Sequence, residues 1–359
     1  MIPYGRQSID SSDVEAVAAQ LRSDWLTNGP RVEEFEAALC AVTGARHAVA
    51  YANGTAALHG AMAAGGIGAG DLVRTSALSF VASAACARFV GADVEFVDID
   101  PTTLNLDPRE VRRCDALVAV HYAGLPVALS ELSVRPRVIV EDAAHALGAV
   151  TPDGPVGNCA HSDMCTFSFH PVKAITTGEG GAVTTNSDEL ANELRRFRSH
   201  GTVPIPERGG WYYEVQTIGY NYRLTDVQAA LGVSQLRKLN AFVARRNDLA
   251  ARYRHLLGGL PVALPPAAPE GTRHAYHLFA VRVPARRAMY DALRAAGIGV
   301  QVHYVPIHHH PVYADPRHDL PQTDRAYEGL LSLPLHPQLT EADQDRVVDV
   351  LATTLAELA

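Results

Sequence analysis

Short apolar runs alternate with amphipathic segments along the first two thirds of the chain. Each run is brief and bounded by turn-forming residues, which is typical of strands. The expected strands are 47–51, 72–76, 94–97, 116–121, 138–141, 164–169 and 182–185, and helices are expected to begin near Gly54, Phe80, Pro108 and Ser187. This alternation predicts an α/β domain built around a mostly parallel central sheet.

The pattern changes toward both ends. Ser12 and Glu15 have the spacing of a capping box, which predicts an N-terminal helix as far as about Arg22. A long helical stretch over 225–257 leads into a proline-rich segment, 260–269. After it we expect a strand over 276–283, a helix over 286–296, a strand over 300–304 and a last helix over 341–358. The chain is therefore expected to form a large domain over 1–240 and a smaller α+β domain over 241–359.

Composition and charge exclude several classes of protein. The 359 residues carry a formal net charge of -8, and the basic residues are dispersed along the chain, so a nucleic acid is not an expected ligand. No apolar run approaches the length needed to span a bilayer, and the first six residues do not begin a signal peptide. Five cysteines without a Cys-x-x-Cys pair favour reduced thiols. We expect a cytoplasmic protein with no membrane contact.

Two familiar kinds of ligand site do not match the sequence. The glycine-rich segment 64–70 lies between a helix and a strand, the reverse of the order in a dinucleotide-binding fingerprint. Cys159, His161 and Cys165 match no common zinc spacing. His303 and the run 308–310 also suggest a metal, but the segment supplies no carboxylate at helical spacing, so we predict an ordinary loop and no metal site.

Lysine is rare in this chain. Lys173 and Lys238 are the only lysines among the 31 basic residues, so arginine serves almost everywhere that a positive charge is needed. A solvated helix face explains Lys238. Lys173 instead follows an expected strand and lies in a loop of small polar residues. Lysine, unlike arginine, can lose its proton and form a Schiff base, which makes Lys173 a candidate catalytic group.

Two further features share the strand-end positions where α/β proteins bind ligands. Asn53 and Gly54 open a helix directly after a strand, and such a helix end can bind an anion, although many turns look alike. Asp142 ends an apolar strand, where it could also be an ordinary helix cap. With the hydroxyl of Ser168 and the amine of Lys173, these groups match the three anchors of pyridoxal 5′-phosphate: phosphate, ring nitrogen and aldehyde.

Four motifs resemble the DegT/DnrJ/EryC1/StrS family of sugar-nucleotide aminotransferases. They occur at 53–58, 141–149, 167–183 and 219–226, so the resemblance covers most of the chain. It implies a pyridoxal phosphate enzyme of fold type I that works as a homodimer with active sites shared between subunits. It assigns the Schiff base to Lys173, the ring nitrogen to Asp142, stacking on the ring to Phe80, the phosphate to Gly54, Thr55, Ala56 and Ser168, and a phosphate contact from the neighbouring subunit to Asn221. His145 departs from the glutamine that is frequent in the family near the cofactor hydroxyl.

A narrower resemblance is to the transaminases of pseudaminic acid synthesis. It implies transfer of an amino group from L-glutamate to C4 of UDP-2-acetamido-2,6-dideoxy-β-L-arabino-hex-4-ulose, giving UDP-4-amino-4,6-dideoxy-N-acetyl-β-L-altrosamine. Three loops carry this resemblance and are expected to contact the sugar nucleotide together with Gly54, Ser168 and Asn221. The loop residues are Tyr4, Asp24, Trp25, Leu26, Thr27, His303, Tyr304, Val305 and Pro306.

Three alternatives remain open at this point. The substrate could be another 4-keto sugar linked to UDP, GDP or dTDP, because only the loops separate these enzymes. A sugar dehydratase with the same cofactor would replace the lysine with histidine, and Lys173 argues against it. A noncatalytic regulator that binds the cofactor would not need the complete set of lysine, aspartate and phosphate cup.

Overall fold

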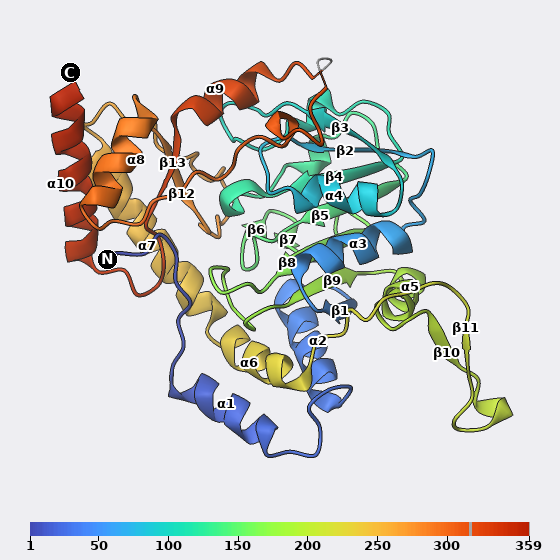
Figure 1. Ribbon diagram of the computed structural model, residues 1–359. Coiled ribbons are helices and arrows are strands. Elements are labelled where there is room, and N and C mark those ends of the chain that lie inside the picture. The colour runs from blue at the N-terminus through green and yellow to red at the C-terminus, as the bar shows by residue number, and fades with distance from the viewer. Residues whose placement is uncertain (316–317, 359) are drawn as a thin grey trace.

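The computed structural model describes residues 1–315 and 318–358 (Figure 1). Its largest sheet has the strand order β1-β9-β8-β5-β4-β2-β3. Strand β9 is antiparallel to both of its neighbours, and the other adjacent pairs are parallel. This confirms the predicted α/β class with a mostly parallel sheet. The strands are β1 (His47–Tyr51), β2 (Leu72–Ser76), β3 (Asp93–Val97), β4 (Ala116–Val120), β5 (Val138–Asp142), β8 (Met164–Ser168) and β9 (Gly181–Thr185).

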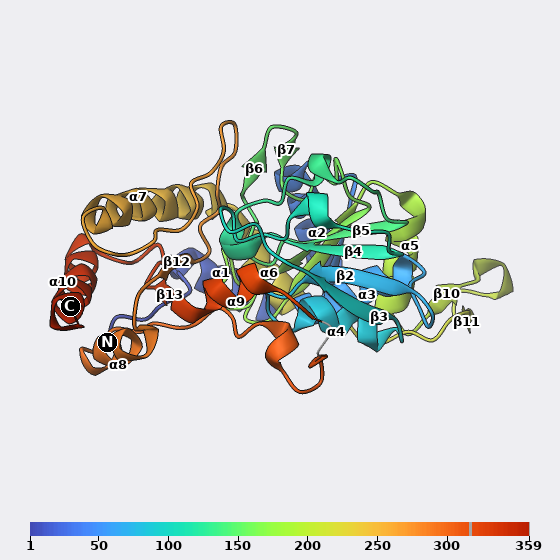
Figure 2. The same ribbon diagram turned by 90° about the horizontal axis from the view of Figure 1, so that it is seen from above.

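Helices cover both faces of this sheet (Figures 1 and 2). On one face, α3 (Gly54–Ala64), α4 (Ala82–Phe89) and α5 (Asp188–Arg198) share a core with alternate strand residues such as Val49 and Tyr51. On the other face, α2 (Pro30–Thr43) and α6 (Asp226–Leu236) pack against the intervening residues, including Ala48 and Ala50. The period-2 alternation of the strands thus supplies two separate cores. In the described part of the chain, no helix is long and apolar enough to cross a bilayer.

A second, smaller lobe lies beyond the long helix α7 (Leu239–Leu257) (Figure 2). Its antiparallel pair, β12 (Phe279–Arg282) and β13 (Leu330–Leu333), packs with α8 (Arg286–Ala295) and α10 (Glu341–Leu358). Helix α7 contributes to the cores of both lobes. Its first turns pack against the large domain, and its later turns pack in the small lobe. The division after residue 240 therefore stays a prediction.

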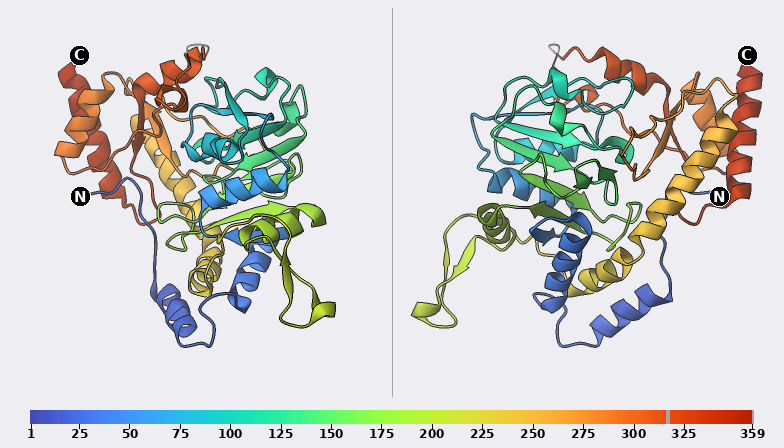
Figure 3. Two further views of the ribbon diagram at one scale, coloured as in Figure 1. Left: turned by 45° about the vertical axis from the view of Figure 1, so that its right-hand side comes forward. Right: turned by 180° about the vertical axis from the view of Figure 1, so that it is seen from behind.

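Two chain segments matter for the site. The N-terminus runs beside the small lobe, where Ile2 bridges to Ile298, before the chain reaches α1 (Ser11–Leu21) (Figure 1). A hairpin of β10 (Thr202–Pro204) and β11 (Tyr213–Val215) projects from the body of the molecule (Figure 3). The remaining elements are α9 (Pro321–Gly329) and a small pair, β6 (Val150–Thr151) with β7 (Gly154–Pro155).

Several local predictions were wrong. The cap of α1 is Asp10, with Asp13 completing the box, because the helix begins one residue before Ser12. The helix expected near Pro108 is a single 3-10 turn, and the stretch over 225–257 is broken between Leu236 and Leu239. Residues 300–304 form no strand but only the isolated bridge of Gln301 to Ser332. Helices α2 and α9, strand β13 and the projecting hairpin were not expected.

Lys238 is also not on a solvated helix face. Its Nζ lies 2.6 Å from Asp10 Oδ1 and 2.8 Å from Asp13 Oδ2, and its side chain is 21% exposed. Burial alone would lower the pKa of Lys238, but hydrogen bonds to these two carboxylates outweigh it and raise the pKa above its usual value. The ion pairs join the start of α1 to the junction between α6 and α7.

Candidate active site

A cavity of about 690 Å³ opens at the carboxyl ends of the parallel strands. It is lined by residues at the ends of strands in the large sheet, together with Tyr4 from the N-terminal segment and residues of the small lobe such as His277 and His303. Many of the residues predicted from the sequence line it: Tyr4, Gly54, Thr55, Ala56, Phe80, Asp142, His145, Ser168, Lys173, His303 and Tyr304. Topology therefore brings together groups that lie far apart in the sequence.

The start of α3 forms an anion cradle at one end of the cavity. Asn53 caps this helix through a 2.8 Å hydrogen bond from Ala56 N to its Oδ1. The N–H groups of Gly54 and Thr55 have no acceptor among the described residues, as is usual for the first turn of a helix. A Cβ on Gly54 would lie 2.9 Å from Cβ of Ser168, so glycine is what allows the helix end to approach Ser168 this closely. These amides and the Ser168 hydroxyl can together bind a phosphate.

Asp142 lies at the end of β5 and is only 6% exposed. Its Oδ2 accepts a 2.7 Å hydrogen bond from Ser83 Oγ, and Ser83 contacts Ser79 Oγ at 2.7 Å. Its Oδ1 accepts a hydrogen bond from Ala144 N at 3.2 Å. These donors hold the carboxylate in one orientation, with no arginine or lysine salt bridge to it among the described residues. Such a group is suited to bind a protonated ring nitrogen.

Lys173 lies in the turn after β8, where its N–H donates to His170 O at 2.9 Å. Its side chain reaches the cavity, and no carboxylate in the described part of the chain forms a salt bridge with it. Burial lowers the pKa of Lys173 to about 8, against the opposing effect of the Asp142 charge. A substantial fraction of this amine is therefore neutral near physiological pH, as attack on an aldehyde requires.

His145 and the small lobe form a second polar wall. Nε2 of His145 lies 3.1 Å from the hydroxyl of Tyr304, while its Nδ1 is buried without a hydrogen-bond partner in the described structure. The ring of His277 is 4.3 Å from that of His145. Burial and the nearby charge of Lys173 lower the pKa of His145 and of His303, the latter to about 4. These imidazoles are therefore neutral at pH 7 and can donate or accept a hydrogen bond.

Two aromatic side chains flank the cavity opening. Phe80 is 54% exposed, and its ring lies 5.8 Å from that of Tyr304. Tyr4 comes from the N-terminal segment and packs on His303 with ring centroids 5.2 Å apart. An exposed phenyl ring at the mouth of a cavity is available to stack on a planar ligand.

The other predicted site residues do not line this cavity within the single chain. Trp25 and Leu26 are 52% and 51% exposed, Asp24 is also exposed, and Thr27 bridges to Thr225. Asn221 is exposed and bridges to Ser199, whereas the next residue, Tyr222, does line the cavity. Val305 and Pro306 follow Tyr304 but lie outside the lining. Their predicted roles stay predictions.

Sequence reasoning missed several residues that the fold brings to the site. Ser79 and Ser83 support Asp142, and His277 packs on His145. The sequence offers a weak signal for His277, because it is a polar residue within an apolar run expected to be a strand. No comparable signal distinguishes the two serines, since their role depends on a helix packing beside β5.

The cavity fits pyridoxal 5′-phosphate. A phosphate can bind at the cradle of α3 and Ser168, a ring nitrogen at Asp142, and an aldehyde at Lys173. The unpartnered Nδ1 of His145 gives a further polar group that a ligand can satisfy.

Comparisons with known proteins agree with this chemistry. The sequence profile of the DegT/DnrJ/EryC1/StrS aminotransferase family matches residues 7–352. The spore coat polysaccharide biosynthesis protein SpsC of Bacillus subtilis is 36% identical, over 98% of this chain and 96% of the relative. The PLP form of the putative sugar aminotransferase Spr1654 from Streptococcus pneumoniae superimposes with a TM-score of 0.92 at 28% identity, over 100% and 99% of the two chains. Helicobacter pylori PseC, an aminotransferase involved in pseudaminic acid biosynthesis, gives 0.91 at 29% identity, over 99% of each chain.

Proposed function

Because the chain belongs to the DegT/DnrJ/EryC1/StrS aminotransferase family, we propose that it moves an amino group from L-glutamate to a 4-keto sugar nucleotide. The chain is a pyridoxal phosphate-dependent sugar aminotransferase, and the proposal concerns its substrates and the roles of its residues. The observation that carries it is Lys173, an amine of lowered pKa in a cavity that also contains a buried aspartate and a phosphate cradle.

Three groups of residues have different proposed roles toward the cofactor. Pyridoxal 5′-phosphate, when bound, supplies an aldehyde that carries the amino group and a ring that withdraws electrons from the carbon losing its proton. Asp142 holds the proton on the ring nitrogen. As a neutral amine, Lys173 Nζ would accept the proton that leaves the amino-bearing carbon, and as an ammonium it would return that proton. Gly54, Thr55 and Ser168 orient the cofactor through its phosphate.

The proposed keto substrate is UDP-2-acetamido-2,6-dideoxy-β-L-arabino-hex-4-ulose. Tyr4, His303 and Tyr304 line the same cavity as Asp142, where a sugar can meet hydroxyl and imidazole groups. Another UDP-, GDP- or dTDP-linked 4-keto sugar is the second candidate, because the same residues offer polar groups without an evident base-specific contact.

Turnover of a panel of 4-keto sugar nucleotides with L-glutamate tests the substrate. We expect the highest kcat/KM with the β-L-arabino compound, since a site that leaves polar groups unpaired can reject an analogue by a factor on the order of 10⁴. A much higher kcat/KM with the D-xylo epimer or a GDP-linked sugar would contradict the proposed substrate. It would not contradict the aminotransferase activity. A Tyr304→Phe variant with unchanged kcat/KM across the panel would remove that hydroxyl from sugar recognition.

A homodimer with shared sites is the second part of the proposal. The projecting hairpin exposes large apolar side chains, with Trp211 at 82% and Tyr213 at 61%, and Ile218 beyond it is 84% exposed. Asn221, three residues after Ile218, is also exposed and lies outside the cavity of its own chain. A second copy that covers these side chains would also bring Asn221 to a neighbouring site.

Mixed dimers test this arrangement. Lys173→Ala subunits and Asn221→Ala subunits are each expected to be inactive or weak alone. Mixing them should restore activity, because one of the two hybrid sites carries both native residues. Hybrids confirmed by mass spectrometry but without restored activity would place Asn221 outside the neighbour's site.

A further inference from the structure

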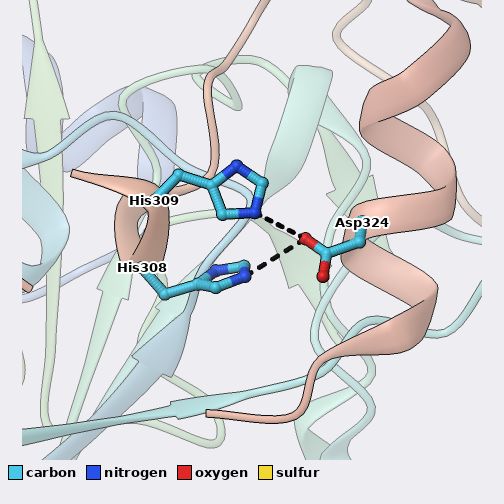
Figure 4. A group of neighbouring side chains, drawn as sticks. All are labelled: His308, His309 and Asp324. Carbon is cyan, nitrogen blue, oxygen red and sulfur yellow. Dashed lines mark hydrogen bonds and ion pairs between the residues drawn. The ribbon is translucent and has the colours of Figure 1, made fainter. Parts of the chain in front are cut away.

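A cluster of two histidines and one aspartate lies outside the cavity described above (Figure 4). His308 and His309 are adjacent in the 3-10 turn Ile307–His309, and Asp324 is on α9. Nε2 of His308 is 3.1 Å and Nε2 of His309 is 2.8 Å from the same oxygen, Asp324 Oδ1. The three side chains point to one spot from two elements, and their potential ligand atoms all lie within 4.8 Å of one another.

This donor set matches a borderline divalent cation. Zinc binds imidazole nitrogen and carboxylate oxygen at about 2.0–2.2 Å, which places neighbouring ligand atoms about 3.4 Å apart in a tetrahedron. The observed separations of 3.1 and 2.8 Å would open by about 0.3 and 0.6 Å, and the ligand nitrogens of the two imidazoles lie within 4.8 Å of each other. Two imidazoles and one carboxylate also leave a position for water, as in sites with three protein ligands.

His308 is buried in the protein, whereas the other two side chains of the cluster are partly exposed to solvent. The His308 side chain is 7% exposed, whereas those of His309 and Asp324 are 35% and 46% exposed. A cation can therefore enter from solvent and meet a ligand that is already held in place. Packing restrains His308, because Ile307 beside it is fully buried and its N–H donates to Ala77 O at 2.9 Å.

We propose that His308, His309 and Asp324 bind a divalent transition cation of the Zn²⁺ class, which fastens the 307–309 turn to α9. The segment directly before this turn carries Tyr304, whose hydroxyl contacts His145 in the cofactor cavity. At its other side, Asp98 Oδ1, just after β3, accepts the N–H of Thr323 at 2.8 Å and anchors the start of α9. The cation thus braces the wall of the cavity without touching cofactor or sugar. The sequence supplied no carboxylate at helical spacing from these histidines, and the fold supplies one from α9.

Metal titration of the holoenzyme tests the site, with Co²⁺ as a spectroscopic probe and Zn²⁺ as its competitor. We expect one Co²⁺ per chain with visible d–d bands, displaced by Zn²⁺. His309→Gln and Asp324→Asn should each weaken binding at least about tenfold, the scale of losing a metal-site contact. The matched control is His310→Gln, the next imidazole in the chain, which is exposed and outside the cluster.

Several outcomes would overturn the proposal. Equal affinity in wild type and Asp324→Asn would mean that Asp324 only accepts hydrogen bonds from two imidazoles. Loss of affinity in His310→Gln, or in only one of the two ligand variants, would exclude the three-ligand site. Because His309 is exposed, its variant is expected to fold even if Asp324→Asn does not. Hydrogen exchange at 303–310 should slow with Zn²⁺ in wild type and not in His309→Gln, and unchanged exchange in wild type would remove the bracing role.

Discussion

The protonation of Lys173 is the property of the site that can be tested most directly. Its pKa of about 8 compares with the ordinary value of 10.5, and the cause is burial, opposed by the Asp142 charge. The difference corresponds to about 3 kcal/mol in favour of the neutral amine. At pH 7 about one tenth of Lys173 is then neutral, against roughly one part in three thousand for an unperturbed lysine. The neutral fraction rises with pH through about 8.

Competitive labelling of the apoenzyme with an amine-reactive reagent measures this pKa. The chain has only two lysines, so Lys238 is a built-in reference in the same sample. Ion pairs with Asp10 and Asp13 raise the pKa of Lys238, whereas that of Lys173 is lowered. Labelling followed by mass spectrometry from pH 6 to 11 should show Lys173 titrating near 8 and Lys238 well above it.

The Asp142→Asn variant sharpens the experiment. Removing the carboxylate charge takes away the one influence that raises the pKa of Lys173, so its titration should move to lower pH. Lys238 should not change, because it lies among different partners. If Lys173 titrates at or above the ordinary lysine value, or moves upward in Asp142→Asn, the reasoning from burial and charge is refuted.

Three further predictions follow from other contacts. In the holoenzyme, Asp142→Asn should keep the cofactor but lose several orders of magnitude in transamination rate, because an amide does not keep the ring nitrogen protonated; near-normal turnover would exclude that role. Gly54→Ala should weaken cofactor affinity roughly ten- to a hundredfold in a fluorescence titration, since its Cβ would lie 2.9 Å from Ser168 Cβ and overpacking costs about 1–3 kcal/mol. The control Gly259→Ala, whose Cβ meets nothing within 4 Å, should have no effect. Lys238→Met should lower the free energy of unfolding by about 1–3 kcal/mol, because it leaves buried Asp13 without its cation, whereas Arg237→Met should be neutral. Equal melting temperatures for the two variants would show that the ion pair contributes nothing.

The sequence predicted the large domain well because its signals are local. The strands of the central sheet are brief apolar runs between turns, and β1 and β2 begin and end where the alternation places them. Lys173, Asp142 and Gly54 line one cavity for a related reason. The carboxyl ends of parallel strands meet at one edge of a sheet, so residues that follow different strands come together without knowledge of the packing.

Predictions in the small lobe and at the termini were weaker, because long-range contacts decide the structure there. Residues 300–304 have the composition of a strand, yet only Gln301 pairs with β13, and the chain instead turns toward the cavity. The local sequence around Lys238 predicts a surface residue on a helix. The packing of α1 against α6 places two carboxylates beside it, which the local sequence does not show.

The sequence by itself therefore determined the fold class, the cofactor and the placement of Lys173, Asp142 and Gly54 at strand ends, since each depends on local patterns or on the fixed geometry of a parallel sheet. The tertiary structure decided which side chains support them. Ser83 reaches Asp142, His277 packs on His145, and Asp324 joins His308 and His309. Each of these contacts joins elements far apart in the chain, and a hydrogen bond or ligand distance near 3 Å depends on how whole helices and loops pack.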